Sequence, residues 1–224
     1  MKKSLASYIQ QREKNRLEHS VHGVPVIVKD VPSVGDWSVH EFVDEFKNIL
    51  PPQLLRDVEI IYIGEFPELK DKNAVYADGA IFITNQEPTV YDMLENVVHE
   101  VAHSLEMRYN NIIYDESLEN EFMVKRKLLK QLLDRAGYEF PEKYYLMSEY
   151  TREFDEFLSG TVGYPALLSL TMGLYLSPYG ATSLQEYFAN GFEKYYLEDP
   201  SFVAKISPEL YKSIERVHYE SETE

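Results

Sequence analysis

The sequence predicts an α+β fold, with a small mixed sheet followed by a larger helical region. Short β-type runs occur in the first hundred residues, and helical periodicity dominates after residue 88. A chain of 224 residues is long enough for one sizeable core. We therefore expect a single domain over residues 1–224, in which residues 1–88 form mainly a sheet lobe and residues 89–224 form a helical lobe.

The composition is that of a globular chain with a strong acidic balance. Hydrophobic residues make up 44% of the sequence and aromatic residues 13%, which excludes a disordered or low-complexity class. The formal net charge of −16 repels phosphate backbones and anionic lipid surfaces. We expect no nucleic-acid partner and no membrane partner, and a basic or neutral peptide suits this field better.

The chain contains no cysteine. A cysteine-based zinc ribbon, a thiol nucleophile and a disulfide framework are therefore all excluded. Any metal site must be built from His, Asp and Glu side chains.

The amino terminus does not have the pattern of a signal peptide. Its two lysines are followed by charged and amide residues by position 10, which leaves no apolar stretch of the required length. No window approaches 18 uncharged apolar residues, the length of a membrane-spanning helix. These features predict a cytoplasmic protein.

Three strands and one helix are expected before residue 88. The runs "VPVIV" (24–28), "VEIIYIG" (58–64) and "GAIFITN" (79–85) are each bounded by Gly, Pro, Asp or Asn, as strands commonly are. Between the first two runs, residues 37–50 repeat apolar side chains at helical spacing, and two prolines then follow. The result is a small mixed sheet with one helix.

From residue 89 the pattern is helical. Thr89 and Asp92 form a capping-box-like start for a helix that we expect to run to about residue 108. The apolar residues of residues 160–180 are interrupted by Gly and Pro, so that segment receives no assignment. Further helices are expected at residues 116–136, 142–159, 183–196 and 208–218.

The first of these helices carries the sequence "VVHEVAHSLE" (97–106), an HExxH motif. Residues four apart share one helical face, so His99 and His103 can direct ring nitrogens at one ion held about 2.0 Å from each. Glu100 points elsewhere and can take a proton from a metal-activated water, as a general base does in HExxH metallopeptidases. The alternative is a surface helix with two ordinary histidines.

A catalytic zinc usually has three protein ligands, so one more side chain is needed. Glu106 lies seven residues beyond His99, about 10 Å along the helix axis, which is too far. Glu106 and Tyr109 also stand where a metzincin has Gly and His, so a metzincin is excluded. Spacing alone does not choose among the downstream acidic residues Glu116, Glu119, Glu121, Glu149, Glu153, Asp155, Glu156, Glu186 and Glu193.

The stretch "SPYGATSLQEYFANGFEKYYLEDP" (177–200) resembles the third-ligand helix of the anthrax lethal factor family of zincins, which includes the Pro-Pro endopeptidases. The resemblance covers roughly residues 75–200. It implies a zincin-like fold around the HExxH helix, with Zn²⁺ held by His99, His103 and Glu186. It also implies that Tyr179 turns its hydroxyl toward the metal.

The resemblance implies a zinc-dependent endopeptidase acting on a peptide or protein, with Glu100 as the general base and Tyr179 assisting. The strand before the HExxH helix is then a candidate edge for pairing with an extended peptide. Three alternatives stay open. Glu186 can be the capping partner of Ser183, Tyr179 can be a packing residue, and the chain can be a non-catalytic zincin-like binding or structural protein, for example of a mobile element.

Overall fold

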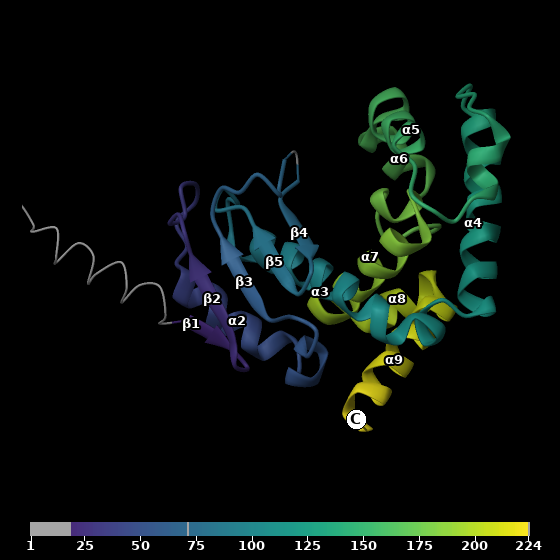
Figure 1. The fold of residues 1–224 in the computed structure, drawn as a ribbon. Coiled ribbons are helices and arrows are strands. Elements are labelled where there is room, and N and C mark those ends of the chain that lie inside the picture. The colour runs from purple at the N-terminus through teal and green to yellow at the C-terminus, as the bar shows by residue number, and fades with distance from the viewer. Residues whose placement is uncertain (1–18, 71, 224) are drawn as a thin grey trace, which may run out of the picture. The chain divides into compact units, whose positions relative to one another are not determined.

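The computed structural model describes residues 19–70 and 72–223 and has a mixed α/β architecture consistent with the predicted α+β class (Figure 1). The chain divides into two compact units, Met1–Leu105 and Glu106–Glu224. The prediction about a signal peptide concerns residues 1–20, most of which lie outside the described range. In the described part of the chain, none of the helices combines the length and the apolar character needed to cross a bilayer.

The first unit contains a five-stranded mixed sheet in the order β1-β2-β3-β5-β4. The central pairs β2·β3 and β3·β5 are parallel, whereas β1 and β4 pair antiparallel with their neighbours. The three predicted strands are present. The bounds are His19–Val21 (β1), Val24–Val28 (β2), Ile60–Ile63 (β3), Ala74–Ala77 (β4) and Ala80–Ile83 (β5).

The outer strands β1 and β4 were not predicted, and each is joined to its partner by a two-residue turn. His22 and Gly23 have φ values of 50° and 92°, and Asp78 and Gly79 have φ values of 48° and 82°. Positive φ at both central residues defines the type I′ turn, for which Asp-Gly is a strong hairpin signal. The "DG" dipeptide was therefore the clue to β4.

The order of the strands shows that the prediction about the edge of the sheet was wrong. The strand before the HExxH helix is β5, which lies between β3 and β4 rather than at an edge. The outermost strand on that side of the described sheet is β4. The hypothesis that the strand preceding the helix pairs with a substrate peptide was therefore wrong. The edge of β5 is already paired with β4, to which the turn at Asp78 and Gly79 connects it.

Helix α2 (Val39–Ile49) confirms the predicted helix at 37–50. Ser38 accepts a hydrogen bond from the Glu41 N–H, and the Glu41 carboxylate accepts one from the Ser38 N–H, so a full capping box starts the helix. A 3-10 helix, η1 (Pro52–Leu55), follows. The buried face of α2 consists of Phe42, Val43 and Phe46.

Helix α3 (Val90–Ile113) carries the HExxH motif. The Thr89 hydroxyl accepts from the Asp92 N–H and the Asp92 carboxylate accepts from the Thr89 N–H, which confirms the predicted capped start. The expected end near residue 108 coincides with Tyr109, whose φ and ψ of −104° and 20° are not helical, although the helix continues beyond it. Its fully buried apolar side chains are Met93, Val97, Val98, Val101, Ala102 and Ile113.

The second unit is helical. The predicted helices at 116–136, 183–196 and 208–218 are present, and α8 was missed. The bounds are Glu116–Arg135 (α4), Glu142–Leu146 (η2), Arg152–Glu156 (α5), Phe157–Gly163 (η3, a π-helix), Tyr164–Leu170 (α6), Tyr179–Ala181 (η4), Leu184–Leu197 (α7), Pro200–Ile206 (α8) and Pro208–Thr223 (α9). Gly191 of α7 lies so close to Leu210 of α9 that a Cβ there would collide with the leucine side chain.

The predicted helix at 142–159 was wrong. The chain instead forms η2, leaves helical geometry at Met147, and restarts at α5, where the Thr151 hydroxyl accepts from the Phe154 N–H. The intervening carbonyls bond to other elements, since that of Met147 accepts from the Arg126 side chain and that of Ser148 from the Leu184 N–H. Those long-range bonds replace the ladder of a continuous helix.

Candidate metal centre

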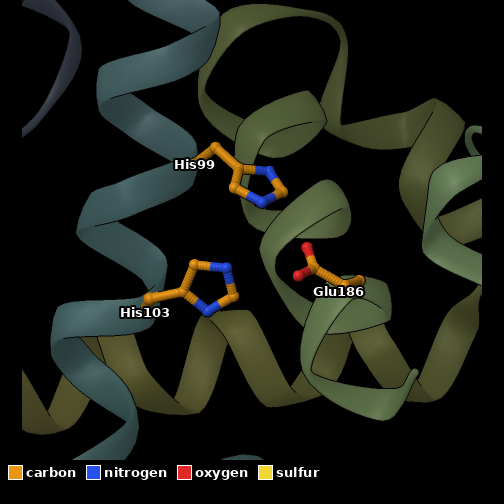
Figure 2. A group of neighbouring side chains, drawn as sticks. All are labelled: His99, His103 and Glu186. Carbon is orange, nitrogen blue, oxygen red and sulfur yellow. The ribbon is translucent and has the colours of Figure 1, made fainter. Parts of the chain in front are cut away.

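The two histidines of the HExxH motif lie on one face of α3, as their spacing predicts. Their ring centroids are 5.0 Å apart and their planes are inclined by 74°. Both side chains are half-buried. Figure 2 shows both rings extending from the same side of the helix.

Glu186 joins these histidines from α7. The nitrogen and oxygen ligand atoms of His99, His103 and Glu186 all lie within 4.8 Å of one another, so the group can hold a metal ion (Figure 2). Only 9% of Glu186 is exposed. A carboxylate removed from water in this way requires compensation from nearby donors or a cation.

The donor set fits zinc. On a tetrahedral zinc ion, two imidazole nitrogens and one carboxylate oxygen would leave the fourth position for water, which is the donor composition of catalytic zinc sites in general. Ligand atoms that share a zinc ion at about 2.0–2.1 Å lie about 3.3 Å apart, a spacing that falls within the 4.8 Å that bounds the observed group. Softer metals favour thiolate ligands, and the chain has no cysteine.

The start of α7 shows the Ser183 half of the capping box that was the alternative role for Glu186. The Ser183 hydroxyl caps the helix by accepting a 3.1 Å hydrogen bond from the Glu186 N–H. That bond uses the backbone of Glu186, whereas its carboxylate belongs to the group with the histidines. Capping by Ser183 and metal binding by Glu186 are therefore compatible.

Tyr179, the predicted facing hydroxyl, lies next to the same carboxylate. It begins the 3-10 helix η4, and its hydroxyl donates to Glu186 Oε1 at 3.2 Å. Burial, and then the negative charges of Glu186 and Asp155, raise the pKa of Tyr179 above its usual value. The phenol is therefore protonated at neutral pH and can serve as a hydrogen-bond donor.

Glu100 is not part of the metal group. It follows His99 by one residue, about 100° around the helix, and only 9% of it is exposed. Its Oε2 accepts a 2.7 Å hydrogen bond from the backbone N–H of Tyr76 in β4. The carboxylate of the predicted general base therefore has a defined orientation.

Arg126, which was not predicted as a site residue, supports the segment that carries Tyr179 and Glu186. One terminal nitrogen of this buried guanidinium donates to the carbonyls of Met147 and Thr182. Thr182 directly precedes Ser183, the cap of α7. Burial lowers the pKa of Arg126 to about 10, so it is still charged at neutral pH. Its position on the apolar stripe of α4, four residues after Phe122, was the available signal.

The other acidic candidates do not join the histidines in the described part of the chain. Glu121, for example, accepts from the Tyr187 hydroxyl and from the Glu209 N–H, which ties α4 to α7 and to the start of α9. The rejected candidate Glu106 accepts from the Gln185 side chain. Glu186 is therefore the acidic residue that this part of the structure brings to His99 and His103.

Comparisons with protein-family models, with curated proteins and with solved structures found no match to this chain. The likeness to the lethal factor family thus stays a prediction based on two short motifs. The geometry of the metal group is an observation independent of that likeness.

Proposed function

We propose that this chain is a zinc-dependent endopeptidase of the zincin type, similar to the lethal factor and Pro-Pro endopeptidase family. The observation that carries the proposal is the meeting of His99, His103 and Glu186, because their donors match a catalytic zinc site with an open position. Glu100 stands beside the ligands as a carboxylate outside the metal group. This separation of ligands from base is what the hydrolytic chemistry of an HExxH site requires.

Each residue has a distinct task in the proposed reaction. Zinc, when bound, supplies a Lewis acid that polarises the scissile carbonyl and lowers the pKa of a water. Glu100 accepts the proton of the attacking water and passes it to the leaving amine. Tyr179 donates its hydroxyl hydrogen bond to the substrate oxygen that gains negative charge.

A peptide or protein with basic segments is the substrate class that the charge of the chain favours. The formal charge of −16 attracts cationic segments. We therefore expect cleavage sites flanked by basic residues.

Digestion of a degenerate peptide library by the metal-loaded protein tests this function. We expect internal cleavage with basic residues enriched around the cut, read out by mass spectrometry. Enrichment of acidic flanks would refute the substrate preference. Bound zinc without any cleavage would instead indicate a binding or structural protein that uses the same ligands.

Tyr179→Phe tests the oxyanion role. Removing one donor to a developing oxyanion lowers kcat by about 10²- to 10³-fold, and the zinc content should be unchanged because the tyrosine is not a ligand. Tyr175→Phe is a matched control, since the buried Tyr175 hydroxyl has no hydrogen-bond partner among the described residues. Full turnover by Tyr179→Phe, measured on a peptide cleaved by the parent protein, would show that its hydroxyl has no part in the reaction.

A further inference from the structure

We propose that the backbone amide of Tyr76 is a positioning group for the general base Glu100. This inference rests on the proposed peptidase function. It starts from the 2.7 Å hydrogen bond that the Tyr76 N–H in β4 donates to Glu100 Oε2. Through this bond, the outer strand of the sheet orients the carboxylate that takes the proton from water.

The register of the β4·β5 hairpin explains why this amide is available. Tyr76 stands opposite Ile81, and Asn73 bonds across the ladder to Thr84. Since bonded and non-bonded pairs alternate in an antiparallel ladder, the pair of Tyr76 and Ile81 is a non-bonded one. The N–H of Tyr76 therefore points away from β5, toward the outer side of β4.

The bond has the features of a strong orienting contact. A carboxylate accepting from an N–H is charge-assisted, and such bonds are about twice as strong as neutral ones. Only 9% of Glu100 is exposed, so little water competes for its oxygens. The Tyr76 hydroxyl donates to the Asp57 carbonyl at 3.2 Å, which adds a second attachment for the strand.

The two carboxylate oxygens of Glu100 therefore have different roles. Oε2 is held by the strand, while Oε1 is the oxygen left to take up a proton from water. Fixing one oxygen removes rotational freedom that Glu100 would otherwise lose in the transition state. Tyr76 does not touch the reacting atoms, so its effect on the reaction is exerted through Glu100.

Because the contact uses the backbone N–H of residue 76, only a substitution that removes this N–H should break it. Tyr76→Ala keeps the amide and should retain activity, whereas Tyr76→Pro removes the N–H. Proline is tolerated on an outer strand where the N–H faces away from the ladder. Ala74→Pro is the matched control, since Ala74 has the same outward register while the hydrogen bond to Glu100 comes from Tyr76.

Kinetics of these three variants provide the first test. We expect Tyr76→Pro to lose about 10- to 100-fold in kcat, by analogy with the loss that follows removal of the groups that orient metal ligands. Tyr76→Ala and Ala74→Pro should keep kcat near that of the parent, and all three should bind zinc equally. Equal kcat values for the two proline variants would overturn the inference.

Amide hydrogen exchange provides a second test that does not depend on catalysis or on a proline variant folding. The Tyr76 amide should be protected in the parent protein and should exchange at least about tenfold faster in Glu100→Ala, with the Val75 amide as an internal reference for the intact hairpin. An unchanged Tyr76 rate would overturn the inference. A parent protein that cleaves nothing contradicts the peptidase function itself, and the exchange rates then report separately on the bond.

Discussion

Glu100→Gln is expected to bind zinc as tightly as the parent protein and to lose about 10²- to 10⁴-fold in kcat/KM, the usual contribution of a general base. Glutamine has nearly the same shape as glutamate and can still accept the Tyr76 N–H hydrogen bond. It cannot take up a proton from water. The variant therefore separates metal binding from catalysis.

The measurement for Glu100→Gln combines zinc analysis with steady-state kinetics on a peptide that the parent cleaves. Glu95→Gln, on the same helix but outside the metal group, is the matched control for loss of a negative charge. Cleavage at the parental rate by Glu100→Gln would remove Glu100 from the mechanism. Loss of zinc from this variant would mean that Glu100 is itself a ligand.

Glu186→Ala is expected to lose its zinc and, with it, all measurable peptidase activity. The substitution removes one of three protein ligands, and two imidazoles alone bind zinc much more weakly. The cap of α7 should persist, because it depends on the backbone N–H of residue 186 and on Ser183. Thermal stability measured without metal should therefore change little.

Ser183→Ala is the control that distinguishes the ligand from the cap. It removes the hydroxyl that caps α7, which costs about 1 kcal/mol of unfolding free energy, and it leaves the Glu186 carboxylate in place. We expect this variant to keep its zinc. A Glu186→Ala protein that is still zinc-replete would exclude Glu186 as the third ligand and return it to a purely structural role.

The parts of the fold that the sequence predicted well are those set by local pattern. Strand β2 and helices α2, α3 and α4 follow from apolar periodicity and from caps whose partners lie three residues apart. The failure at residues 142–159 has a different cause. There the backbone carbonyls of Met147 and Ser148 are bound by residues distant in sequence, and no local pattern encodes such partners.

In the candidate site, too, the features set by neighbouring residues were predictable, whereas those set by residues distant in sequence were not. His99 and His103 are one helical turn apart, so their common face follows from helix geometry alone. Glu186 lies 83 positions after His103 and was reached only through a motif resemblance. The amide that holds Glu100 comes from the backbone of Tyr76 and is invisible to any analysis of side-chain types.

The central claim is that His99, His103 and Glu186 jointly hold one zinc ion, and metal analysis of the purified protein tests it most directly. After removal of loosely bound metal, we expect about one zinc ion per chain, with an X-ray absorption spectrum showing two imidazole nitrogens and additional oxygen ligands at about 2.0–2.1 Å. A protein that retains no zinc after exposure to the metal would contradict the claim, as would zinc whose spectrum lacks imidazole scattering.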